Sequence, residues 1–188
     1  MSINHAILGL LSWKPCTGYD LKKFFEGSTL MHWSGNNNQI YKALVQLSAE
    51  GLVTSETLHQ EGAPSKKLYH LTKEGQQALR KWVLGDIELP EFKKPFLVQL
   101  AWADQLEDQE LLNLIQRYED ELEVGLRTVQ EQMRRNSDVP ARTSREKLLW
   151  EMMRDSLITS YHNELDWVSR VRKNLLNLKE NPHEPSGD

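Results

Sequence analysis

The sequence holds a single cysteine and no long apolar run, and both absences narrow the class of protein. Cys16 alone cannot close an internal disulfide, which favours a reducing compartment. A membrane-spanning helix needs about 18 or more consecutive apolar residues, and no such stretch occurs. No signal-peptide pattern is found either. We therefore expect a cytoplasmic protein with no membrane partner.

Patterns that would support catalysis or a bound cofactor are also missing. The six histidines show no metal-ligand spacing. No glycine-rich phosphate loop occurs, and Cys16 has no histidine partner by motif. We expect no catalytic residue, no metal and no cofactor, so the protein is not expected to be an enzyme.

Charge is divided unevenly along the chain. The net charge is −4, which by itself argues against a nucleic-acid partner. Residues 1–85 nevertheless contain nine Lys or Arg and six Asp or Glu, whereas residues 86–188 contain 14 and 21. Because counterion release depends on charge at the interface rather than on the total, the basic first part remains able to bind DNA.

Three short helices are predicted before residue 53. Residues 2–13 hold a compact apolar block that Lys14-Pro15 ends, and Thr17 caps a second helix over residues 18–27. The third begins at Ser34 as its N-cap and stops at Gly51, where a left-handed cap forms easily. Short helices with brief connections are the layout of a helix-turn-helix module.

The third helix begins with an unusual polar run. Its first turns carry amides and one ammonium group without any acid, at Asn36, Asn37, Asn38, Gln39 and Lys42. Amide side chains can bond adenine in the DNA major groove. Ordinary capping of a surface helix explains the same run, so the helix alone leaves both interpretations open.

A β-hairpin is predicted after this helix. Residues 52–59 and 66–71 are rich in β-forming residues and flank a loop at residues 60–65 that contains Gly and Pro. Lys66 and Lys67 stand at the exit of that loop. The hairpin makes the module a winged helix, with these lysines near DNA phosphates.

Beyond Pro90 the pattern becomes entirely helical, with apolar residues spaced three and four apart over two long stretches. Helices of roughly 30 and 38 residues extend about 45 and 57 Å, and one monomer cannot bury both stripes. A second copy is the expected cover. The predicted domains are a winged helix-turn-helix domain at 1–86, a helical dimerisation domain at 92–180 and a disordered tail at 181–188.

Four blocks carry a family resemblance: HAILGLLS at 5–12, GYDLKKFF at 18–25, QIYKALVQLSAEGLV at 39–53 and KKLYHLTKEG at 66–75. In this order and spacing they resemble the N-terminal domain of the PadR family of winged-helix transcription regulators. The C-terminal half is similar, by architecture and length, to the family's longer two-helix dimerisation domain. The fold expected is therefore mainly α, an N-terminal winged helix-turn-helix with a small β-hairpin wing plus a C-terminal long-helix dimerisation domain.

The resemblance also implies a function. Members are cytoplasmic homodimers, mostly repressors of inverted-repeat operators, and those similar to the phenolic-acid regulator release double-stranded DNA when a small aromatic acid binds. It places the polar helix in the major groove, with Tyr41 on the DNA backbone and Lys66 and Lys67 near phosphates. The rival interpretation is a protein–protein adaptor built on the same winged-helix module and helical scaffold.

Aromatic residues raise the question of an effector pocket. Six tryptophans occur, and stacking on aromatic faces favours flat ligands. The candidates for such a pocket are Trp33, Trp102, Trp150, Tyr161, His162 and Trp167. Tryptophan that fills a dimer interface explains any one of them as well.

Overall fold

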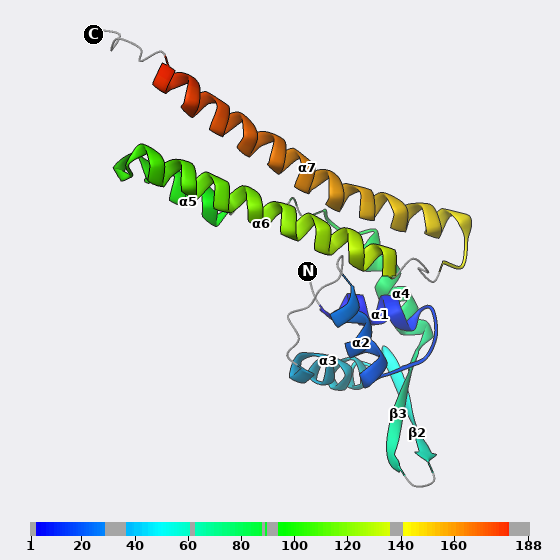
Figure 1. Cartoon of the computed structure of the whole chain (residues 1–188). Helices are drawn as coiled ribbons and strands as arrows, with labels where there is room; N and C mark the ends of the chain where they lie inside the picture. Colours follow the sequence, from blue (N-terminus) through cyan, green and yellow to red (C-terminus); the bar gives the residue numbers. More distant parts are fainter. Residues whose placement is uncertain are drawn as a thin grey trace. The chain divides into compact units, whose positions relative to one another are not determined.

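A computed structural model of the chain describes residues 3–28, 37–60, 63–87, 89, 94–135 and 141–180. It divides into two compact units (Figure 1). Unit 1 comprises Met1–Leu89 with Pro140–Lys147, and unit 2 comprises Pro90–Val139 with Leu148–Asp188. The segment 140–147, expected within the helical domain at 92–180, thus clusters with the N-terminal part instead. The tail at 181–188 lies outside the described residues.

Unit 1 opens with helices joined by short connections. Helix α1 (Ile3–Leu11) is followed by the two-residue strand β1 (Cys16–Thr17), helix α2 (Gly18–Gly27) and helix α3 (Asn37–Ala49). Thr17 caps α2 as predicted, because its hydroxyl accepts a hydrogen bond from the Asp20 N–H while the Asp20 carboxylate accepts one from the Thr17 N–H. These hydrogen bonds also lower the pKa of Asp20.

One apolar core joins these elements. Its buried residues are Ile7, Leu8, Leu10, Leu11, Cys16, Leu21, Phe25, Ile40, Ala43, Leu44, Leu47, Val53 and Tyr69. Cys16 lies within it, and burial raises the pKa of its thiol. A buried protonated thiol is a poor nucleophile.

The sheet of unit 1 has three strands in the order β1-β3-β2. Strands β2 (Val53–Gln60) and β3 (Ala63–Leu71) form the predicted antiparallel hairpin, which extends away from the helices of this unit (Figure 1). The prediction of a loop over residues 60–65 is wrong, since β3 already begins at Ala63. Lys66 and Lys67 therefore lie within the strand. The sequence analysis also missed β1, which pairs with β3 at Leu68 and Tyr69.

Helix α4 (Lys73–Val83) closes unit 1 against the turn after α3. Thr72 caps α4 by accepting from the Gly75 N–H at 3.0 Å, and its hydroxyl donates to the Gly51 carbonyl at 2.8 Å. Gly51 has φ 71°, the left-handed conformation predicted for the end of α3. The turn after the third helix is thereby tied to the start of the fourth.

Unit 2 is helical throughout its described residues. It contains α5 (Pro95–Ala101), the 3-10 helix η1 (Ala103–Gln105), α6 (Asp108–Arg135) and most of α7 (Ser144–Glu180). The long helices α6 and α7 lie side by side and antiparallel (Figure 1), since Tyr118 of α6 donates to Glu164 of α7 while Arg172, further along α7, reaches back to Gln116. The mainly α fold with a small hairpin wing is confirmed.

Packing in unit 2 centres on three buried residues. Phe96, Ile115 and Val168 come from α5, α6 and α7 respectively. The Phe96 ring stacks on Tyr118 with centroids 3.7 Å apart, and burial together with the Glu164 carboxylate raises the Tyr118 pKa to about 12. The two long helices are thus joined by an apolar seam with a hydrogen bond beside it.

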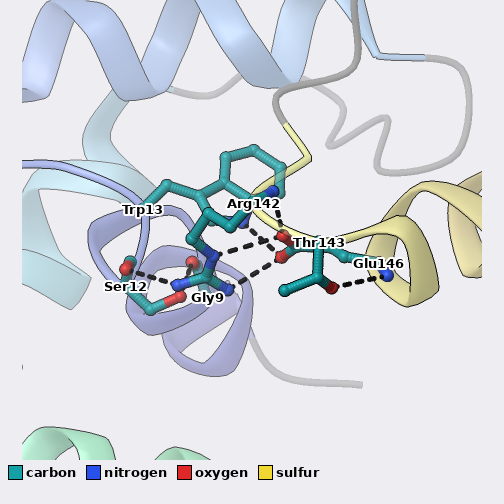
Figure 2. Close-up of polar contacts among 6 residues, drawn as sticks. All are labelled: Gly9, Ser12, Trp13, Arg142, Thr143 and Glu146. Carbon is teal, nitrogen blue, oxygen red and sulfur yellow. Dashed lines mark hydrogen bonds and ion pairs between the residues drawn. The ribbon is translucent and has the colours of Figure 1, made fainter.

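The first turn of α7 is fastened to the end of α1 within unit 1 (Figure 2). The Arg142 guanidinium donates to the Ser12 carbonyl at 2.8 Å, and the Trp13 indole N–H donates to the Glu146 carboxylate at 2.9 Å. Glu146 also accepts from the Arg142 backbone N–H at 2.7 Å, and its own N–H donates to the Thr143 hydroxyl at 3.0 Å. We call Trp13, Arg142 and Glu146 the α1–α7 clasp.

The clasp makes stability depend on pH. Hydrogen bonds from Arg142 lower the Glu146 pKa from its usual 4.5 to about 2. Because this pKa is lower in the folded state, the ionised carboxylate stabilises the fold fully above pH 4.5, and that contribution is lost as pH falls toward 2. Glu146→Gln should lower the free energy of unfolding by about 1 kcal/mol at pH 7.

Urea titrations across this range check the prediction. The gap between wild type and Glu146→Gln should narrow as the pH is lowered from 5 toward about 2, the pKa of Glu146. Asp166→Asn, which neutralises an exposed carboxylate on the same helix, serves as the control and should show little change. A gap for Glu146→Gln that stays constant with pH contradicts the assignment.

Candidate nucleic-acid interface

Helix α3 presents two opposite faces with different chemistry. Its inward face carries the buried Ile40, Ala43, Leu44 and Leu47. The face opposite, at spacings of four, three and four, consists of Asn38, Lys42, Val45 and Ala49, all exposed. We call these four residues the outward stripe. Burial of the first face therefore determines which side chains the helix offers to a partner.

The predicted polar run falls partly on this stripe. Asn38 and Lys42 belong to it, and Gln39 is exposed on its flank. Asn36 lies outside the described residues, as does the side chain of Asn37, which opens the helix. Two of the predicted contacts, Asn38 and Lys42, therefore share one exposed face of α3.

Val45 is a residue that the sequence analysis missed. It is 69% exposed in the middle of the outward stripe. The spacing from Asn38 and Lys42 was the available signal, since positions four and three apart share a helix face.

Tyr41 lies at the other flank of α3, against the start of α2. A Cβ placed on Gly18 would lie 2.7 Å from the Tyr41 Cε1 and 3.3 Å from its hydroxyl oxygen. The ring therefore passes over the Gly18 backbone, and the side chain remains 50% exposed. This brings the Tyr41 hydroxyl beside the first turn of α2, whose partial positive charge favours anions.

The two wing lysines occupy neighbouring positions in β3. Lys66 pairs across the hairpin with Leu58 and Lys67 with Thr57. Successive strand residues point to opposite faces of a sheet, so the two ammonium groups are directed to different sides. Hydrogen bonds from Thr17 are the main cause of the lowered pKa of Asp20 at the start of α2, and the Lys66 charge adds to them.

The residues predicted for an effector pocket are not gathered in one place. Trp33 lies outside the described residues. Trp150 and Trp167 both belong to α7, but the 17 residues that separate them span about 25 Å of helix. Trp167 packs edge-on against Phe96 in the core of unit 2.

The remaining candidates differ in their surroundings. The Tyr161 ring lies against Gly125, where a Cβ would be 2.8 Å from its Cε1, so Tyr161 serves the contact between α6 and α7. His162 is exposed. Trp102, 70% exposed, lines an open pocket of about 820 Å³ in unit 2. The other residues around this pocket are Gln99, Ala103, Leu106, Glu110, Asn113, Leu114, Gln116 and Arg117.

Comparisons with known proteins agree with this architecture. The family described as transcriptional regulator PadR-like matches residues 7–81, and the family described as virulence activator alpha C-term matches residues 92–175. The negative transcriptional regulator PadR of Bacillus subtilis is 34% identical over 122 residues. Residues 7–81 thus form a domain of the PadR-like family of transcriptional regulators. The alignment with the Bacillus regulator covers 64% of this chain and 65% of that one.

A second relative is the probable transcriptional regulator Rv1176c of Mycobacterium tuberculosis, 32% identical over 83 residues, or 44% of each chain. This PadR-like chain also shares its fold with solved structures. Bacillus subtilis PadR in complex with operator DNA superposes with a TM-score of 0.78 at 24% identity, covering 92% of this chain and 98% of that one. The Vibrio cholerae virulence activator AphA gives 0.69 at 22%, with 94% and 99% covered.

The PadR-like family is one of regulators rather than of enzymes. Within the residues that the structure describes, no helix is long and apolar enough to cross a membrane. No group of three His, Cys, Asp or Glu side chains in those same ranges could hold a metal ion.

Substitutions at two glycines, Gly75 and Gly18, distinguish a loss of stability from a displacement of the Tyr41 ring. Gly75→Ala would put a Cβ 2.1 Å from the Leu52 carbonyl oxygen, and a backbone atom cannot move aside easily. We expect this variant to lose about 3 kcal/mol or more of stability. Gly18→Ala meets only the movable Tyr41 ring, so it should cost less than about 1 kcal/mol while displacing that ring.

Urea unfolding of both variants, with NMR of the tyrosine ring signals, checks this pair. Equal losses of stability, or an unmoved Tyr41 in Gly18→Ala, would show that the ring does not rest on the Gly18 backbone.

Proposed function

We propose that this PadR-like chain is a homodimeric transcriptional repressor that binds an inverted-repeat operator with the outward stripe of α3. The observation that carries the proposal is the division of α3 into a buried apolar face and an exposed face with an amide and an ammonium group, Asn38 and Lys42. Amides bond adenine and lysine bonds guanine in the major groove. Operator DNA places its site of action in the cytoplasm.

Phosphate contacts would set the position of the helix on the duplex. Tyr41 and the first turn of α2 offer a hydroxyl and the positive end of a helix at one point, while Lys66 supplies a charge from the wing. Lys67, on the other face of the same strand, is expected to contribute less. Contacts of this kind fix register without reading sequence. Gln39, together with Asn36 and Asn37, completes the set of proposed contacts.

A dimer is supported by the apolar surface of unit 2. Four side chains on one side of α7 are 40–58% exposed, namely Leu148, Leu149, Met152 and Met153. Their spacing of one, three and one keeps them on one side of the helix. Exposed apolar patches of this kind mark association sites. Two copies would present two α3 helices about 34 Å apart, one turn of DNA.

Regulation by a small aromatic acid is the second part of the proposal. A crystal structure of Bacillus subtilis PadR holds p-coumaric acid. In this chain the pocket beside Trp102 offers an aromatic face and the Arg117 guanidinium, the two groups that such an acid requires. An effector bound in unit 2 would favour a dimer conformation with lower operator affinity.

Salt-dependent DNA binding tests the first part. Lys66→Ala should weaken operator binding and reduce the slope of log K against log salt by about one, because one phosphate contact is lost. Tyr41→Phe should weaken binding by roughly three- to tenfold without changing that slope, since only an uncharged hydroxyl is removed. Fluorescence anisotropy with a duplex from the promoter of its own gene, at several salt concentrations, measures both.

Lys67→Ala is the matched control and should change the slope less than Lys66→Ala does. Addition of p-coumaric acid to the same assay tests release, and the Trp102→Ala variant should respond less to it. If the wild-type protein binds no duplex in a salt-sensitive way, the adaptor interpretation replaces the repressor.

Assembly is tested by sedimentation at micromolar concentration, where the wild type should be a dimer. Leu149→Glu places a charge in the proposed apolar contact and should raise the dimer dissociation constant at least tenfold. Ser169→Glu adds the same charge at an exposed position of α7 away from this face and should leave the dimer intact. A monomeric wild type contradicts the proposal.

A further inference from the structure

We propose that Val45 reads the 5-methyl group of a thymine in each half of the operator. This inference rests on the function proposed above and adds to it a specificity-determining residue that is neither polar nor charged. Val45 is 69% exposed at the centre of the outward stripe, although Ile40, Leu44 and Leu47 of the same helix are almost completely buried. The folded unit thus leaves one branched apolar side chain on the face that carries Asn38 and Lys42.

Packing within unit 1 gives no reason for this valine. Its helix contributes Ile40, Ala43, Leu44 and Leu47 to the core, each at most 4% exposed, and Val45 is absent from that core and from the residues packed against it. Valine is also a weaker helix former than alanine. The residue therefore adds little to the stability of α3, and its chemistry is available to a ligand.

The major groove offers one apolar group that an isopropyl side chain can recognise. Guanine and adenine present N7 and exocyclic groups there, and cytosine presents an amino group, whereas thymine presents its 5-methyl group. Valine can form no hydrogen bond, so contact with any other base edge would leave a polar group without its water. A β-branched side chain in a helix is also held in one main rotamer, which orders it before DNA arrives.

The neighbours of Val45 locate the thymine within the half-site. Lys42 precedes it by three residues on the same stripe, a rise of about 4.5 Å along the helix. Because base pairs follow one another every 3.4 Å or so, the thymine should lie within one or two base pairs of the base that Lys42 reaches. Ala49 follows one turn later on the same stripe, which leaves the valine unobstructed toward the groove.

Deoxyuridine provides a direct test, since it differs from thymidine only by that methyl group. An operator duplex is first selected from a random DNA pool with the full-length protein. Each thymine of a half-site is then replaced in turn, and affinity is measured for the wild type and for Val45→Ala. Burial of one methyl-sized group corresponds to about fourfold in affinity.

The expected result is a single thymine position where deoxyuridine weakens wild-type binding about fourfold and leaves Val45→Ala unaffected. Replacement in both half-sites should weaken wild-type binding by roughly fifteenfold. Val83→Ala is the matched control, because Val83 is 67% exposed but ends α4, and this variant should respond to deoxyuridine as the wild type does. Unchanged circular dichroism spectra establish that Val45→Ala is folded.

Two results would overturn the inference, and they differ. If the protein selects no duplex, the proposed repressor function fails and the assignment of Val45 fails with it. If a duplex is selected but deoxyuridine affects the wild type and Val45→Ala equally at every position, DNA binding stands and Val45 does not read a methyl group.

Discussion

The burial of one face of α3 is the constraint on which the rest of unit 1 depends. Ile40, Leu44 and Leu47 are almost inaccessible to solvent, and removing any one of them from the core would cost about 2–5 kcal/mol. Their positions fix the rotation of the helix about its own axis, so the residues opposite them must face outward. Because an α-helix repeats every 3.6 residues, one face of α3 can pack in the core while the opposite face stays available to a partner.

Local polar contacts also stabilise the elements that come before and after α3. Thr17 and Thr72 cap the helices before and after it, and the Thr72 hydroxyl also reaches the turn at Gly51. The α1–α7 clasp brings a distant part of the chain into the same unit. Helix α7 begins within unit 1 and continues without a break into unit 2.

Features set by local sequence were predicted well. The cap at Thr17 and the left-handed Gly51 depend on a few neighbouring residues, and the structure confirms both. The wing loop was predicted too long because Pro64 was taken as a loop residue. At Pro64, β3 has only β2 beside it, since β1 pairs no further than Leu68. A strand with one free edge tolerates a residue that has no N–H.

Features set by tertiary contacts were not predictable in the same way. The clasp joins residues 133 positions apart, and the local sequence around Trp13 or Glu146 does not predict this contact. The proposed aromatic pocket shows the same limit, because the sequence around a tryptophan does not tell whether the ring packs in a core, as Trp167 does, or lines a pocket, as Trp102 does. The site residues on α3 remain predictions, although their division between two faces is now defined.

The composition of the outward stripe bears on how specificity arises in this protein. Asn38 and Lys42 have flexible polar side chains that water solvates equally well, so each hydrogen bond to a base replaces one to solvent and adds little net affinity. Val45 has no such competition, because its contact with a methyl group removes apolar surface from water on both sides. Under the proposed function, discrimination by hydrogen bonds and discrimination by shape would therefore act on neighbouring base pairs from one helix face. A recognition helix with so few charges must draw its affinity from phosphate contacts elsewhere, which is the part that Lys66 and the wing are placed to supply.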